Sequence, residues 1–302
     1  MNRPSRQMPP EHGDWRVPLE RPEEAEHLPL NMLHRTRLRV EALQSVPEGY
    51  QPYEAEAEPA IVPISGWARA LRLAAAWFLL LPISVVMVYA LLLSLYNSGE
   101  TVGQLSFWTS VPVWYSLLGA ATYVALIMVR VVTPILVFIY VLGHELTHAL
   151  AAKLCMGKVQ RLRIDLNGGY VETDADNLFI ALSPYFVPLW MCCWLLVLWA
   201  INWAHPFPEW EAWFYAGLGF WWSFHLYWTV WVIPREQPDM LENGLLFSLL
   251  IIMIMNIAIL LVVLYVFGVI TPSGYGHDFL EASRQIIESA RALYAWLQQL
   301  CM

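Results

Sequence analysis

This chain has few charged residues and only four cysteines. Only 14% of its 302 residues are Asp, Glu, Lys or Arg, and it has no basic tract of the kind that binds nucleic acid. The four cysteines form no disulfide framework, because Cys192 and Cys193 are adjacent within an apolar run. No long apolar segment precedes about Leu71, so we expect no signal peptide. The sequence therefore predicts neither a nucleic-acid-binding protein nor a disulfide-stabilised one.

Apolar residues stand where charge is missing. They make up 58% of the chain, and several runs are longer than the roughly 18 residues that suggest a transmembrane helix. We therefore expect an all-α polytopic membrane protein with about six transmembrane helices within residues 67–270. Residues 1–66 are rich in Pro, Glu and Arg, which predicts a mostly disordered N-terminal extension. Residues 271–302 place apolar side chains at helical spacing, which predicts an amphipathic C-terminal helix at the membrane interface.

Polar loops and prolines divide the apolar sequence. The run from 111 to 152 is too long for one crossing at about 1.5 Å per residue, so we divide it near Arg130 and Pro134. Between the third and fourth helices, residues 159–173 alternate in polarity around Asn167-Gly168-Gly169, which predicts a short β-hairpin. The predicted helices cover about 71–96, 111–130, 134–152, 174–203, 211–233 and 241–270.

Basic residues near the span ends suggest the orientation. Four of them lie around the predicted hairpin and place it in the cytoplasm: Lys153, Lys158, Arg161 and Arg163. The N-terminal end of the first span does not follow this rule, because a topology with six spans would put Arg69 and Arg72 on the outer side of the membrane. Either those arginines are tolerated there, or the segment 111–132 is re-entrant. We expect an integral multi-pass membrane protein with the hairpin on the cytoplasmic side.

The third predicted helix carries three ionisable residues in an apolar setting. His144 and His148 are four residues apart, Glu145 follows the first, and residues 131–143 carry no charge. On a helix this spacing puts both imidazoles on one face, and the adjacent carboxylate can reach a water held at the same ion. Ionisable groups in a membrane helix cost several kcal/mol each and are kept for function or pairing. The pattern predicts a zinc site with His144 and His148 as ligands and Glu145 as general base.

A catalytic zinc ion usually takes a third protein ligand from elsewhere in the chain. Asp239 lies at the head of the sixth predicted helix, where the helix dipole favours a carboxylate. The loop count puts it on the cytoplasmic side, towards which the third helix ends. His225 competes from about two turns deeper in the fifth helix. Both residues remain candidates on this reasoning, with Asp239 preferred.

These features resemble the site-2 protease family of intramembrane zinc metalloproteases, and in particular its small bacterial members. The resemblance covers roughly residues 130–260 and implies that His144, His148 and Asp239 bind Zn²⁺ while Glu145 is the catalytic base. Two departures are visible: the glycine that usually follows the family's aspartate is replaced by Met240, and there is no PDZ-like module. The matching stretches are His144-Glu145-x-x-His148, Gly157-Lys158-Val159 through Gly168-Gly169-Tyr170, Leu182-Ser183-Pro184-Tyr185, and Pro238-Asp239.

The function expected from these residues is hydrolysis of peptide bonds in membrane-embedded protein substrates, with the hairpin holding the substrate extended by β-augmentation. One alternative is a protease whose third ligand is a glutamate such as Glu242. A second is a non-catalytic zinc-binding membrane sensor or scaffold, and a third is a transporter. Glu145 favours catalysis, because a sensor needs the ligands but not that carboxylate. The expected partners are a membrane protein substrate and the lipid bilayer, with no nucleic acid, and the oligomeric state stays open.

Overall fold

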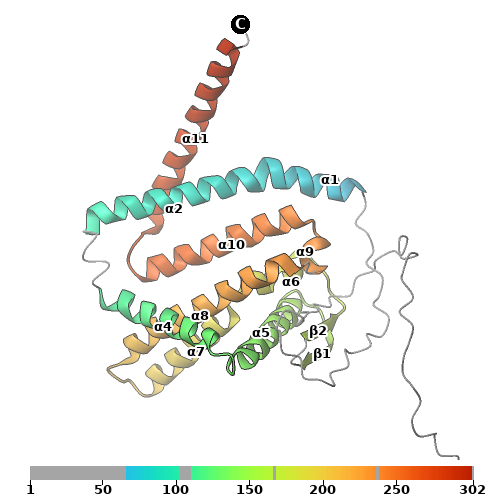
Figure 1. The fold of residues 1–302 in the computed structure, drawn as a ribbon, viewed down its shortest axis with the longest axis vertical. Coiled ribbons are helices and arrows are strands. Elements are labelled where there is room, and N and C mark those ends of the chain that lie inside the picture. Colours follow the sequence, from blue (N-terminus) through green and yellow to red (C-terminus); the bar gives the residue numbers. More distant parts are fainter. Residues whose placement is uncertain (1–65, 103–109, 166–167, 236–237, 301–302) are drawn as a thin grey trace, which may run out of the picture.

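A computed structural model describes residues 66–102, 110–165, 168–235 and 238–300 (Figure 1). The predicted N-terminal extension, apart from Gly66, lies outside these residues, as do Asn167 of the predicted turn and Cys301. The three described cysteines are free thiols, as expected.

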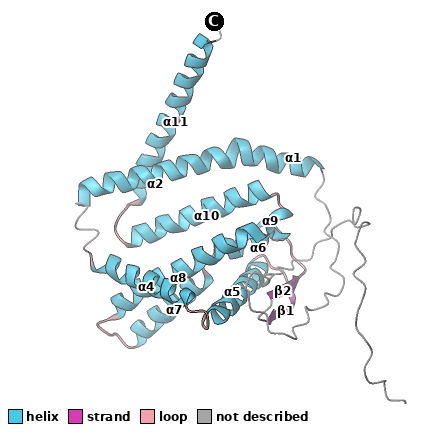
Figure 2. Cartoon of the chain, in the orientation of Figure 1, coloured by secondary structure: helices cyan, strands magenta, loops and turns pink. Residues whose placement is uncertain are grey.

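The described chain is mostly helical, with one small sheet (Figure 2). Its helices and strands are α1 (Gly66–Ala75), the π-helix η2 (Ala76–Leu80), α2 (Leu81–Val102), α4 (Val111–Met128), α5 (Thr133–Leu154), β1 (Val159–Asp165), β2 (Gly168–Thr173), α6 (Leu178–Leu182), the 3₁₀ helix η3 (Ser183–Tyr185), α7 (Leu189–Ala204), α8 (Trp210–Val232), η4 (Ile233–Arg235), α9 (Pro238–Leu241), α10 (Leu245–Val266) and α11 (Pro272–Leu300).

Four helices are long and apolar enough to cross a membrane. They are the continuous helix through α1 and α2, then α4, α5 and α10, and the bent pair formed by α6–η3 and α7 would make a fifth. The helix α8 has the length, but its glycines, tyrosines, tryptophans and histidine lower its hydropathy. The structure thus supports a membrane protein with several apolar helices, while the predicted number of about six is not reached by length and hydropathy alone.

One of these apolar helices, α5, is mostly buried inside the protein. In α5, 61% of the most apolar window is buried inside the protein, against 17% in each of the other three. The core around α5 contains Val141, Tyr185 and Trp228, drawn from α5, η3 and α8. Polar groups on α5 can therefore be satisfied by protein rather than exposed to lipid. This position explains how a helix at membrane depth accommodates two histidines and a glutamate.

The prediction of one continuous helix over about 174–203 is wrong. The chain forms α6 and η3, turns by 73°, and continues as α7. Pro184 and Pro188 lie at this bend, and neither can donate a backbone hydrogen bond. The helix predicted over about 174–203 runs through both prolines, because membrane helices commonly tolerate proline. Here they end one helix and begin the next, which turns α6 and Tyr185 towards α5.

The hairpin predicted after α5 is present as two antiparallel strands that pack against that helix. Leu162 pairs with Val171 and Ile164 with Gly169, and a bulge lies between Val159 and Arg161. Gly168 and Gly169, which the sequence analysis assigned to the turn, belong to β2. Figure 1 shows the sheet beside α5 at one end of the helical body, near α6 and α9. The hairpin therefore lies next to the helix that carries the two histidines.

Glycines allow α4 and α8 to approach closely. A Cβ at Gly119 would lie 1.9 Å from the carbonyl oxygen of Ala216, and one at Gly219 would lie 2.0 Å from that of Ser116. The Ser116 hydroxyl also donates to the carbonyl oxygen of Tyr215 at 2.9 Å. Small residues and interhelical hydrogen bonds are the usual means of helix association in membranes. This contact fixes α8, which forms one wall of the site described below.

The C-terminal helix α11 crosses α2 and then extends away from the helical body (Figure 1). At the crossing, the buried carboxylate of Asp278 accepts hydrogen bonds from Ser94 Oγ at 2.6 Å and Asn97 Nδ2 at 2.8 Å. Beyond the crossing the helix is exposed, and its apolar residues include Leu293 and Trp296. The predicted amphipathic C-terminal helix is therefore attached to α2 through buried polar contacts.

Asp278→Ala is expected to loosen α11. The substitution removes the acceptor of the buried Ser94 hydroxyl, which costs about 1–3 kcal/mol for an unsatisfied buried polar group, and one contact of the half-buried Asn97. We expect a lower midpoint of thermal unfolding in detergent and faster proteolytic release of the C-terminal helix. Glu288→Ala, at an exposed position of the same helix, is the matched control and should change neither quantity. Equal behaviour of the two variants would show that the Asp278 contacts do not hold α11.

Candidate metal centre

Three side chains of α5 form the first part of the site: His144, Glu145 and His148. His144 and His148 lie one turn apart, so their rings lie on the same face, with centroids 4.9 Å apart. Glu145 follows His144 and is fully buried. Both histidines are also buried, with 2% and 1% of their surface exposed. The spacing of the sequence motif thus produces a shared imidazole face inside the protein.

Asp239 reaches this face from a separate short helix. It lies in the first turn of α9, where the sequence analysis expected the head of a longer helix, and is buried. Its Oδ2 is 3.5 Å from His148 Nε2 and 3.9 Å from His144 Nε2. One ligand atom from each of the three residues lies within 4.8 Å of the other two. The fold therefore brings Asp239, which follows His148 by 91 positions in sequence, to the two histidines as a group that could hold a metal ion.

His148 is oriented by a backbone carbonyl. Its Nδ1 lies 2.9 Å from the carbonyl oxygen of Ile180 in α6. A carbonyl only accepts, so Nδ1 carries a hydrogen and Nε2 is the ring nitrogen that faces Asp239. Asn177 positions this carbonyl, because its side-chain Oδ1 accepts the Ile180 amide at 2.9 Å and caps α6. The bend after α6 thus contributes directly to the geometry of the histidine.

Two tyrosines support the other two members of the group. The Tyr140 hydroxyl lies 3.2 Å from His144 Nδ1, one turn earlier on α5, and its ring stacks on Trp228. The Tyr185 hydroxyl donates to Asp239 Oδ2 at 3.0 Å. Partners of this kind fix the direction in which a ligating histidine or carboxylate points. Each of the three candidate ligands therefore has a supporting contact, and in Asp239 that contact is made to Oδ2, the oxygen that also faces the two histidines.

The residues present fit a metal ion. His144 Nε2 is buried and has no hydrogen-bond partner among the described residues. A buried polar atom without a partner is costly, and a metal ion at the centre of the group would satisfy it. Two imidazole nitrogens and a carboxylate oxygen form a donor set typical of catalytic Zn²⁺, which leaves a fourth position for water. The structure itself shows a possible metal site without showing which metal it takes.

Glu145 lies against the β-hairpin. A Cβ added at Gly169 of β2 would lie 2.6 Å from Glu145 Cγ and 3.2 Å from Cδ. The absence of a side chain at this position is therefore what lets the strand approach the carboxylate. Strand β2 therefore packs directly against the Glu145 side chain, next to the two histidines.

The two alternative ligands considered from the sequence lie elsewhere. His225 Nε2 is 3.3 Å from Asn256 Oδ1, and its ring stacks against Trp222, so it is not part of the three-residue group. Glu242 also lies outside that group, and its carbonyl oxygen accepts a hydrogen bond from Arg72 at 3.4 Å. Among the described residues, Asp239 is the candidate that the fold brings to His144 and His148.

Several contributing residues were not identified from the sequence. Tyr140 could have been found, because it is four residues before His144 and so shares its helix face. Gly169 and Tyr185 lie in stretches that carry the resemblance, but their roles, like that of the Ile180 carbonyl, depend on the bend after α6 and on the packing of the hairpin.

Comparisons of the chain with protein-family models, with curated proteins and with solved structures find no match. The arguments for function therefore rest on the residues and geometry of the chain itself.

Proposed function

We propose that the protein is an intramembrane zinc metalloprotease that hydrolyses peptide bonds of membrane-embedded protein substrates. The observation that carries the proposal is the buried convergence of His144, His148 and Asp239 on an apolar helix, with Glu145 next to the first histidine. The resemblance of this motif and of the adjacent hairpin to site-2 proteases supports the same reading. In this proposal the three converging residues hold Zn²⁺.

A zinc ion held by His144, His148 and Asp239 would act as a Lewis acid that polarises a carbonyl and lowers the pKa of bound water towards neutrality. Glu145 accepts the proton of the attacking water on a carboxylate oxygen and then delivers it to the leaving amine. Tyr185 and the Ile180 carbonyl keep Asp239 and His148 in position through the cycle. Burial of the whole group excludes bulk water, which strengthens each of these electrostatic contacts.

The hairpin is proposed to hold the substrate. A transmembrane helix hides its carbonyls in internal hydrogen bonds, so it must be unwound locally before it is cut. A two-stranded sheet can accept an extended segment as a further strand. Since Gly169 of β2 lies against Glu145, a segment added to this sheet would lie near the proposed base.

The proposed topology has six crossings, made by the four apolar helices, the bent pair α6–α7 and α8. Lys153 at the end of α5, Lys158 in the loop that follows and Arg161 in β1 favour a cytoplasmic position for the hairpin and the site. The proposed location is the cytoplasmic membrane of a bacterium. Accessibility labelling of single cysteines at the α7–α8 loop and in β1 would test this arrangement, and labelling of both from the same side would contradict it.

The function is tested with the full chain reconstituted in lipid vesicles together with a panel of single-span proteins. We expect fragments cut within or near the span, loss of cleavage after treatment with a zinc chelator, and recovery when zinc is added back. Cleavage that persists without metal would contradict the zinc mechanism. Stoichiometric zinc without cleavage of any substrate would favour the zinc-binding sensor or scaffold instead.

Gly169→Ala is expected to reduce cleavage while leaving zinc bound. The added methyl group must displace either Glu145 or strand β2, and a misplacement of about 1 Å can cost on the order of 100-fold in rate. The atoms nearest to the added methyl group belong to Glu145 and Arg163 and not to the three proposed ligands, so zinc content should equal that of the wild type. Gly276→Ala is the control, because nothing lies within 4 Å of a Cβ there. Equal turnover in both variants would show that the packing of the hairpin against Glu145 does not affect cleavage.

A further inference from the structure

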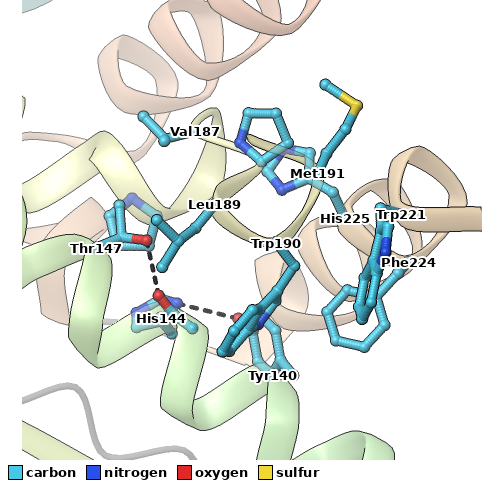
Figure 3. Close-up of a pocket in the computed structure, with 13 residues that line it drawn as sticks. Tyr140, His144, Thr147, Val187, Leu189, Trp190, Met191, Trp221, Phe224 and His225 are labelled. Carbon is cyan, nitrogen blue, oxygen red and sulfur yellow. Dashed lines mark hydrogen bonds between the residues drawn. The ribbon is translucent and has the colours of Figure 1, made fainter. Parts of the chain in front are cut away.

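A pocket lies beside the proposed metal centre, on the side of His144 away from the hairpin. It is enclosed by α5, by the bend from Pro184 to Met191 and by α8 (Figure 3). Its empty volume is about 350 Å³, part of which opens outward. His144 forms part of its wall, together with Thr147 of the same helix. A proposed metal ligand thus borders a cavity that no step of the mechanism above uses.

Most of the polar groups around this pocket are already engaged within the protein. Thr147 Oγ1 donates to the Gly143 carbonyl at 2.7 Å, and Trp190 Nε1 donates to the Ile139 carbonyl at 3.0 Å. The Tyr140 hydroxyl is in contact with His144 Nδ1, and His225 Nε2 with Asn256. An ordered water in a cavity needs two to four polar partners, and these walls offer little that is not already used.

The rest of the wall is apolar. Leu189, Met191 and Phe224 line the pocket from the bend and from α8, and Figure 3 shows Leu189 above the face of α5 that carries His144 and Thr147. An apolar cavity of this kind gains free energy by enclosing an apolar group. A water channel to the metal would need the opposite lining.

We propose that this pocket receives a large apolar side chain of the substrate, on a residue flanking the bond that is cut. The inference rests on the proposed function. Because His144 is at once a ligand and part of the pocket wall, a peptide with its carbonyl at the metal centre places the neighbouring side chain beside that wall. Leu189 sets the size of side chain that fits, and the enzyme selects cleavage positions next to leucine-like residues.

The test uses zinc-loaded full-length protein in detergent and two small hydroxamates as probes. Glycine hydroxamate carries only the zinc-chelating group, whereas leucine hydroxamate adds an apolar side chain. We expect the wild type to bind leucine hydroxamate about ten- to one-hundred-fold more tightly, as measured by calorimetry, because the side chain is buried. Leu189→Trp should abolish this difference while keeping the zinc content and the affinity for glycine hydroxamate.

A second variant guards against misfolding of the first. Leu189→Ala enlarges the pocket and should shift the preference from leucine hydroxamate towards phenylalanine hydroxamate. Equal binding of the glycine and leucine compounds by the wild type would overturn the pocket assignment and leave the metal site intact. Failure of glycine hydroxamate to bind the zinc-loaded protein would instead overturn the proposed metal site, and the pocket assignment with it.

Discussion

Glu145→Gln should lower proteolysis by about 10²- to 10⁴-fold, the range that general-base catalysis typically contributes. The two side chains are nearly isosteric, so glutamine can occupy the buried space beside Gly169 without a change in packing. It cannot accept the proton of the attacking water. Zinc content, expression and thermal stability should therefore remain those of the wild type.

The measurement pairs zinc stoichiometry with cleavage of a single-span substrate in the same preparation. Wild type and Glu145→Gln should carry equal zinc and differ in rate, and the variant could retain uncleaved substrate in a complex recoverable from detergent. A variant that cleaves as fast as the wild type would remove Glu145 from the mechanism. A variant that loses zinc would show that the carboxylate serves the site structurally instead.

Asp239→Ala is expected to lower zinc affinity by at least about ten-fold, since even partners that only orient a ligand contribute 10- to 100-fold. The substitution removes the carboxylate within 3.5 Å and 3.9 Å of the two histidine Nε2 atoms. It also leaves the Tyr185 hydroxyl without its acceptor. Competition with a fluorescent zinc chelator measures the affinity directly.

His225→Ala is the matched control for this experiment. His225 is similarly buried and borders the pocket beside His144, yet it lies outside the three-residue group. Its zinc affinity should stay near that of the wild type, once corrected for the folded fraction. The reverse pattern, with zinc lost in His225→Ala and kept in Asp239→Ala, would transfer the ligand role to His225.

Local signals predicted the part of the site that lies within one element. His144, Glu145 and His148 share a helix because of their spacing, and the structure places both imidazoles on one face. The hairpin follows from alternating polarity around Asn-Gly-Gly, and the division of the apolar run near Arg130 matches the break between α4 and α5. These features depend on residues that are close in sequence, so the sequence could reveal them.

Features that depend on contacts between residues far apart in the sequence could not be predicted in the same way. The 73° bend at Pro184 and Pro188 could not be separated from a kinked span, because membrane helices tolerate proline. The sequence leaves Asp239 and His225 as alternatives, and it is the fold that brings the Asp239 carboxylate within 3.5 Å of His148 Nε2. The contacts of Ile180 and Tyr185 with the site depend on that bend and link residues 32 and 54 positions apart.

The most direct test of the account is zinc K-edge X-ray absorption of the purified full-length protein. The prediction is one zinc per chain, bound by two imidazole nitrogens at about 2.0–2.1 Å and by oxygen at about 2.0–2.2 Å. In His144→Ala and His148→Ala this imidazole signal should disappear together with stoichiometric zinc. A sulfur shell near 2.3 Å, or full zinc occupancy in the doubly substituted protein, would contradict a centre built from His144, His148 and Asp239.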